Sequence, residues 1–316
     1  MITVHKYSSG NIEKISIDDF HSNMKSVWID CLNPTKKDIE LISEKTGIAI
    51  DDIKESLDES ERPRIFANEN YSEIVFREPY VEKKELRTAP VSIFFSENLV
   101  VTIRNYEVST FIKIEQLPHE QKIQLFQEGI PYFVFRILDF MINNFFSIMD
   151  KIEDDIDYIE GAVVRNPGKD VVKRIFEIKK TLIYFHKAST AEREVLTTIE
   201  KGYSHHIKSK EIREFRTLYN DVTQLIDMEA TYREILTGTL DMYLSSISNN
   251  LNITMKKLTV IASFVLIPTL ISGIYGMNFA RMLPDRNWQY GFYIALGLMA
   301  TSILLLYWYF KKQNWI

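Results

Sequence analysis

Two long uncharged runs near the C-terminus dominate the hydrophobic pattern of this 316-residue chain. Residues 258–280 contain no charged side chain, and neither do residues 287–310, whose apolar centre is 291–310. Each run reaches the roughly 20 residues needed to cross a hydrocarbon core of about 30 Å, whereas a buried core helix needs only about 10–14. The pattern therefore predicts two membrane-spanning helices, at 258–278 and 291–310.

The charges beside these runs predict their orientation. Lys256 and Lys257 precede the first run, and Lys311 and Lys312 follow the second, within a basic tail at 311–316. The positive-inside rule places both flanks, and with them both termini, in the cytoplasm. We therefore expect a multi-pass protein of the cell membrane, with the connecting loop at 279–290 outside.

Residues 1–130 carry the short β-rich runs and capped helical runs of a mixed α+β domain. Strands are expected at 2–7, 27–31, 71–80 and, as two strands that turn at Glu97 and Asn98, at 90–104. Helices are expected at 35–46, ending at Gly47, and at 51–60, each opened by a capping residue. The predicted fold class is a mixed sheet with flanking helices in the cytoplasm.

From Pro131 onward the pattern becomes helical. Residues 131–211 predict an antiparallel helical hairpin, joined by the turn Asn166-Pro167-Gly168. No stop signal follows residue 212 before the membrane, so the stalk at 212–257 and the first span are expected to form one helix of about 65 residues, or about 95 Å. Such a helix cannot bury its own surface and needs neighbours from its own chain or from other subunits.

One stripe of residues follows this helix at steps of three and four, a mean of about 3.6 residues per step. Its members are Asp241, Ser245, Ser248, Asn252, Met255, Leu258, Ala262, Leu266, Thr269 and Gly273. The cytoplasmic half is polar, and the membrane half mixes small, hydroxyl-bearing and apolar residues. On periodicity alone an ordinary packing seam is favoured over a pore, because Ala262 and Gly273 suit close helix contacts. A pore would also require an oligomer, since two spans cannot enclose one.

The composition narrows the classes of function. With 46% apolar residues, 26% charged residues and a formal net charge of −5, the chain is folded and lacks the basic excess typical of nucleic-acid binding. The single cysteine, Cys31, excludes an intramolecular disulfide framework and a cysteine-rich zinc site. A phosphate loop is absent, because Val163 occupies the position of its leading glycine. Neither an enzyme nor an organic cofactor is indicated.

The tetrapeptide Tyr275-Gly276-Met277-Asn278 stands directly after the first span. With the long helix before it and the short loop, second span and basic tail after it, the chain resembles the CorA family of magnesium transport proteins. A YGMN motif that ends the first of two C-terminal membrane helices is the hallmark of that family. Further matches are Tyr243-Leu244-Ser245-Ser246, Arg62-Pro63 and Pro268, so the resemblance covers essentially the whole chain. It departs in the outer loop, where Met282-Leu283-Pro284-Asp285 replaces Met-Pro-Glu-Leu.

This resemblance implies a homopentameric funnel in the lipid bilayer whose pore is lined by the first membrane helix, which favours the pore over the seam. It also implies a selectivity filter of Gly276, Met277 and Asn278, in which neutral oxygens, including the Asn278 amide, hold a hydrated Mg²⁺ ion. The implied function is channel-type Mg²⁺ transport driven by the membrane potential, with Co²⁺ or Ni²⁺ as further candidate cargo. The alternatives are a Zn²⁺ transporter of the same GxN superfamily and a two-span signalling or tethering protein with a coiled-coil stalk.

Gating by cytoplasmic Mg²⁺ is also implied, through carboxylates that face each other between neighbouring subunits. Counting back from the Arg-Pro step places the first on Glu55. Counting back from the filter places the second on Thr217, which cannot be a charged ligand. Glu214 and Asp221 lie three and four residues away on roughly the same helix face and are the candidate substitutes. The alternative is that Glu55 and Asp221 are ordinary surface acids.

Overall fold

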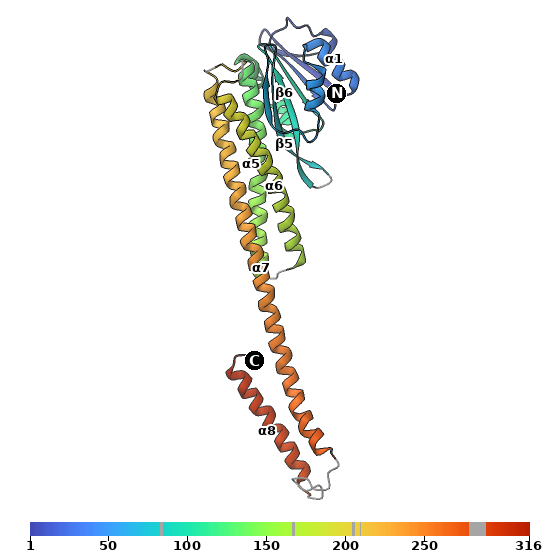
Figure 1. Ribbon diagram of the computed structural model, residues 1–316, viewed down its shortest axis with the longest axis vertical. Helices are drawn as coiled ribbons and strands as arrows, with labels where there is room; N and C mark the ends of the chain where they lie inside the picture. Colours follow the sequence, from blue (N-terminus) through green and yellow to red (C-terminus); the bar gives the residue numbers. More distant parts are fainter. Residues whose placement is uncertain (83–84, 166–167, 204–205, 209, 278–288) are drawn as a thin grey trace. The chain divides into compact units, whose positions relative to one another are not determined.

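The computed structural model describes residues 1–82, 85–165, 168–203, 206–208, 210–277 and 289–316 (Figure 1). The described chain divides into two compact units. The first is formed by Met1–Ala162 and Gly168–Leu240, and the second chiefly by Asp241–Ile316. The first unit contains the sheet and the helices packed on it, and the second contains the two most apolar helical segments of the chain.

Within the described residues, one seven-stranded sheet has the order β2-β1-β3-β7-β6-β5-β4. Its strands are β1 (Ile2–Ser8), β2 (Asn11–Ile15), β3 (Val27–Leu32), β4 (Arg64–Ala67), β5 (Ser72–Glu82), β6 (Glu85–Phe95) and β7 (Leu99–Arg104). Only the β3–β7 pair is parallel, so the predicted mixed sheet is confirmed. The sequence pattern missed β2 and β4, because these two edge strands contain no buried residue and therefore show no alternation.

The β6–β7 turn at Glu97 and Asn98 is confirmed, and Ser96 N–H donates to the Leu99 carbonyl across it at 2.9 Å. Strand β6 begins five residues before the predicted start at residue 90. The proline at position 90 suggested a strand boundary. Instead, β5 pairs with β6 along its length, from Ser72 opposite Phe95 to Glu82 opposite Glu85.

Helix α1 (Lys36–Thr46) confirms its prediction, since Thr35 and Asp38 form a capping box and Gly47 ends the helix at φ 76°. The prediction for 51–60 was wrong at both ends. Helix α2 (Ile50–Ser56) has no side-chain cap, and it ends early because Asp58 accepts hydrogen bonds from the Ser60 backbone and hydroxyl. Two short helices, α3 (Ser109–Gln116) and α4 (His119–Gln127), lead into the long helices.

Helix α5 (Ile130–Arg165) is long and apolar enough to cross a membrane, yet half of its most apolar window is buried within the first unit. Its Phe133 ring packs edge-on against Trp28 of β3, with ring centroids 5.3 Å apart. Its Phe145 ring packs against Phe185 of α6 (Lys169–Glu200) at 4.8 Å. The hydrophobic face of α5 therefore covers the sheet and α6, as in a core helix.

Helix α7 (Ile212–Tyr275) is unbroken over 64 residues and contains Pro268, which confirms the predicted continuous helix. Helix α8 (Gly291–Lys312) lies beside the C-terminal part of α7 (Figure 1). Both helices are long and apolar enough to cross a membrane, and only 6% of the apolar window of α7 and none of that of α8 is buried. Such extensive exposed apolar surface needs lipid or other protein around it.

Candidate functional site

The membrane half of α7 presents two different faces. Val260 is buried, and Phe264, Ile267 and Ile271 are half-buried; Phe264 contacts Phe310 of α8. At 100° per residue, the predicted stripe falls on the opposite side of the helix. All ten of its members are exposed, including Leu258 and Leu266 at 58% and 68%. The stripe is therefore not the surface that packs on α8, and within the described chain it faces outward.

The hydroxyl groups near this stripe are held by the helix itself. Thr269 donates its proton to the Val265 carbonyl at 2.7 Å, one turn earlier. Thr259 donates to the Met255 carbonyl in the same way at 2.9 Å. Because the proton is used within the helix, the Thr269 oxygen retains acceptor capacity for a cation or for a water bound to one.

Gly276 and Met277 form the turn that ends α7. Gly276 N–H donates to the Ser272 carbonyl at 2.9 Å, and Met277 N–H donates to the Ile274 carbonyl at 3.2 Å. A Cβ atom at position 276 would lie only 3.2 Å from the Ser272 oxygen, so this turn favours glycine. The Met277 side chain is 51% exposed. Asn278 and the outer-loop sequence Met282-Leu283-Pro284-Asp285 lie outside the described residues.

Glu55, the first candidate for the regulatory site, lies near the end of α2 with its side chain 64% exposed. Its Oε2 atom is 3.6 Å from Arg64 Nη2. The Arg64 guanidinium also pairs with Glu61 at 2.8 Å and with the fully buried Glu73 at 2.8 Å. Glu55 is therefore accessible to a cation, but a cation must compete with the Arg64 guanidinium for it.

The second half of the predicted regulatory site lies in the first turns of α7. Glu214 and Asp221 are half-buried, and the pKa of each carboxyl is raised, chiefly by burial. Glu211 and Glu128 add to this rise at Glu214, and Asp139 adds to it at Asp221. Thr217 between them is exposed and donates its hydroxyl to the Glu214 carbonyl at 2.7 Å. A divalent cation would relieve the unfavourable burial of negative charge at both acids.

These acids do not form a complete metal site in one chain. The described residues contain no group of three or more His, Cys, Asp or Glu side chains arranged to hold a metal ion.

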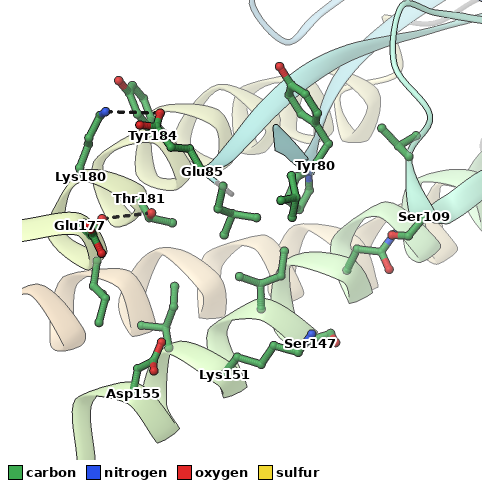
Figure 2. Close-up of a pocket in the computed structure, with 18 of the residues that line it drawn as sticks. Tyr80, Glu85, Ser109, Ser147, Lys151, Asp155, Glu177, Lys180, Thr181 and Tyr184 are labelled. Atoms are coloured by element: carbon green, nitrogen blue, oxygen red, sulfur yellow. Dashed lines mark hydrogen bonds and ion pairs between the residues drawn. The ribbon is translucent and has the colours of Figure 1, made fainter. Parts of the chain in front are cut away.

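A groove of about 710 Å³ lies between the β5–β6 hairpin and helices α5 and α6 (Figure 2). Both cationic and anionic side chains line this groove. Lys180 Nζ lies 3.8 Å from Glu85 Oε2, and Arg174 pairs with Asp155 at 2.5 Å. Because charges of both signs face one another across it, the groove shows no preference for an ionic ligand.

The sequence pattern missed two buried glutamates, Glu192 on α6 and Glu229 on α7, both with 0% exposure. One signal was present in the sequence. Glu192 follows the buried Ser189 by three residues and precedes the buried Val195 and Leu196 by three and four, which places a carboxyl group at a core position of the helical repeat.

Each kind of comparison with known proteins finds CorA proteins. The family model described as CorA-like Mg2+ transporter protein matches residues 23–312. The cobalt/magnesium transport protein CorA of Methanocaldococcus jannaschii is 34% identical over 307 residues, which cover 96% of this chain and 95% of that relative. The protein of the same description from Thermotoga maritima is 30% identical over 304 residues, covering 95% and 86%. The complete structure of the CorA magnesium transporter from M. jannaschii matches with a TM-score of 0.87 at 29% identity, covering 100% of this chain and 99% of that one.

Proposed function

The chain belongs to the family of CorA-like Mg²⁺ transporters, and from this premise we propose that it forms a channel for Mg²⁺, and also for Co²⁺, in the cell membrane. One observation carries the proposal. The face of α7 that points away from α8 is exposed along the whole stripe, and it leads to the Gly276–Met277 turn where the filter motif begins. Several copies of α7 around a central axis would turn this face into the wall of a pore, and a homopentamer is the assembly we propose.

The chemistry of this face suits a hydrated divalent cation. Mg²⁺ releases its water reluctantly and prefers octahedral oxygen ligands. The backbone oxygens of the filter and the Asn278 amide are neutral, so they bind the hydration shell without the strong retention that a carboxylate ring would cause. Two charges moving inward through ~100 mV gain about 4.6 kcal/mol, so no coupling to ATP is required.

The closed state is proposed to depend on apolar rings. Met255, Leu258 and Leu266 lie on the stripe and are all more than half exposed. In an assembly with α7 at its axis, each would form a ring of apolar side chains, and a narrow apolar constriction blocks ions by excluding water.

Closure by cytoplasmic Mg²⁺ is proposed to involve Glu55 of one subunit and Glu214 or Asp221 of the next. Without the ion these carboxylates repel one another; a bridging divalent cation would hold the subunits in the closed arrangement. A ligand shifts such an equilibrium only by its difference in affinity for the two states. The competition of Arg64 for Glu55 and the missing carboxylate at Thr217 therefore predict weak regulation, effective at high Mg²⁺ concentration.

The decisive experiment is ion uptake into proteoliposomes that contain only this protein, with Mg²⁺, Co²⁺ and Zn²⁺ compared under an imposed inside-negative potential. Mg²⁺ uptake that rises with the potential supports the proposal. Uptake of Zn²⁺ alone would favour the zinc transporter, and absence of uptake of all three ions would favour the two-span tethering protein. Protease accessibility of both termini in right-side-out and inverted vesicles tests the cytoplasmic placement of the ends.

A further inference from the structure

Two buried carboxyl groups connect α7 with α6 and the sheet. Glu229 of α7 accepts a hydrogen bond from Ser189 Oγ of α6 at 3.0 Å, and its other oxygen lies 3.2 Å from His186 Nδ1. Glu192 of α6 accepts a hydrogen bond from the backbone N–H of Arg77 in β5 at 3.0 Å. Both glutamates are completely buried. The contacts therefore run from β5 through α6 to α7, all within the first unit.

A negative charge on Glu192 would have little compensation. The Oε2 atom of Glu192 is buried and has no hydrogen-bond partner among the described residues. The Arg77 guanidinium on β5 donates to the backbone carbonyls of Glu59, Glu61 and Thr88, so its hydrogen bonds go to groups other than Glu192. An ionised Glu192 would thus be a buried carboxylate with one backbone hydrogen bond, which is strongly unfavourable.

The charged groups around the pair come from three elements. Strand β5 contributes Arg77, which favours ionised Glu192, and Glu78, which opposes it. Helix α6 contributes His186 and Arg193, and helix α7 contributes Arg233, which favours ionised Glu229. The pKa of His186 is lowered chiefly by burial and further by Arg233 and Arg193. Glu229 itself disfavours ionisation of Glu192. Burial outweighs these cations and raises the pKa of Glu192 and of Glu229 to about 8.

We propose that Glu192 and Glu229 form a proton-dependent latch, in which Glu229 joins α7 to α6 and Glu192 joins α6 to β5, and which holds these elements together while both carboxyl groups are protonated and weakens when they ionise. We call this pair the carboxyl latch. A neutral carboxyl group is readily accommodated beside Ser189 and His186. A carboxylate in the same place loses its hydration without gaining a paired cation. Ionisation therefore favours separation of α7 from α6, because separation lets water reach the charge.

The direction of the pH effect follows from linkage. Each group binds its proton more tightly when buried than when exposed, because its pKa rises from an ordinary value near 4.5 to about 8. Between about pH 4.5 and pH 8 the buried arrangement therefore binds more protons than an opened one. Its stability consequently falls as the pH rises through this range. Above about pH 8 both arrangements are ionised and the latch contributes no further change.

The latch also has a consequence for transport, and this part rests on the proposed function. Helix α7 continues without a break from Glu229 to the stripe that begins at Asp241. A cytoplasm that becomes alkaline would loosen the cytoplasmic part of the helix whose other end lines the proposed pore. The Mg²⁺ concentration that closes the channel would then depend on cytoplasmic pH.

The test compares the full-length protein in detergent with the double variant Glu192→Gln/Glu229→Gln, since glutamine matches the neutral acid in shape and cannot ionise. Glu194→Gln/Glu234→Gln is the matched control, because both of these glutamates are exposed on the same two helices. We expect the melting temperature of the wild type and of the control to fall between about pH 6 and pH 8.5. In Glu192→Gln/Glu229→Gln the melting temperature should change much less over this pH range. Backbone hydrogen exchange should show α6 and α7 opening at the higher pH only in the proteins that retain both glutamates. Equal pH slopes in all three proteins would overturn the proposal.

A second measurement keeps the test valid if the double variant folds poorly. Difference infrared spectroscopy at neutral pH should show protonated carboxyl groups in the wild type whose band shrinks in each single variant, Glu192→Gln and Glu229→Gln. Ionised carboxylates at both positions at neutral pH would overturn the latch. Neither readout depends on ion transport, so these experiments can fail while the channel proposal stands, or succeed while it fails.

Discussion

Phe264 of α7 and Phe310 of α8 pack their rings at a centroid distance of 6.0 Å with their planes inclined by 64°. This contact determines which side of α7 faces its neighbour within the chain. Leu258, Ala262 and Leu266 consequently point away from α8 and are exposed. The outward-facing side of α7 is the surface that we propose to line the pore, and five predictions test this proposal and its regulation.

Removing the Asn278 amide from the proposed filter should abolish selective Mg²⁺ entry. Asn278→Ala deletes the proposed ring of amide oxygens while removing little packing volume, so the oligomer should still assemble. We expect Mg²⁺ uptake into proteoliposomes to fall by about tenfold or more, which corresponds to about 1.4 kcal/mol of lost barrier stabilisation. Asn314→Ala in the tail that follows α8 is the control and should transport normally. Unchanged uptake and unchanged cation competition in Asn278→Ala would refute the filter assignment.

A charge in the proposed constriction should open it. Leu258→Asp places carboxylates in a ring that excludes water when apolar, so the pore should hydrate and conduct even at high internal Mg²⁺. Leu258→Val keeps the ring apolar and should still close. The measurement is current or tracer flux at saturating internal Mg²⁺. If Leu258→Asp closes as tightly as the parent, the pore axis lies on another face of α7.

Neutralising the proposed regulatory acids should reduce the sensitivity of the proposed channel to internal Mg²⁺. The double variant Glu55→Gln/Asp221→Asn removes one proposed ligand from each side of the subunit contact. Its control, Glu40→Gln/Asp227→Asn, removes two exposed acids from α1 and α7. Flux measured against internal Mg²⁺ should shift to higher concentrations in the first variant only. Identical closure curves would show that the regulatory site lies elsewhere.

The Mg²⁺ concentration needed to close the channel through Glu214 and Asp221 should depend on pH. Because the pKa of Glu214 and of Asp221 is raised, each binds protons at a higher pH than an ordinary surface acid. Protons compete with Mg²⁺ for a carboxylate, so the Mg²⁺ concentration needed for closure should increase as cytoplasmic pH falls. The carboxyl latch acts on the alkaline side instead, because it weakens as pH rises, so Asp221→Asn should diminish the acid-side effect alone.

The turn that ends α7 should be intolerant of a side chain. In Gly276→Ala the new Cβ atom would lie 3.2 Å from the Ser272 carbonyl oxygen, so the last helical turn must shift where the proposed filter begins. We expect reduced uptake. Gly297→Ala on α8 is the matched control, because a Cβ atom there meets nothing within 4 Å, and it should be neutral or slightly stabilising by up to about 1 kcal/mol. Equal activity of the two variants would contradict a close-packed turn at Gly276.

Several features were determined by the sequence alone because their causes are local. The two apolar runs, the unbroken helix from residue 212 and the Thr35–Gly47 boundaries of α1 depend on neighbouring residues along the chain. The Tyr275-Gly276-Met277-Asn278 motif in its setting identified the family, which the family model and the relatives confirm. None of these features depends on residues that are distant in the sequence.

Other features were decided only by the tertiary structure. Helix α5 is apolar enough for a membrane, but its contacts with β3 and α6 bury half of its apolar window. Edge strands β2 and β4 have no buried residues to produce a pattern, so only their pairing partners define them. The burial of Glu192 and Glu229 and the choice of the α7 face that meets α8 likewise depend on residues far away in the chain. The physical reason is common to all of them: desolvation and packing are set by whichever surfaces meet in space, and a residue's neighbours along the chain do not specify these.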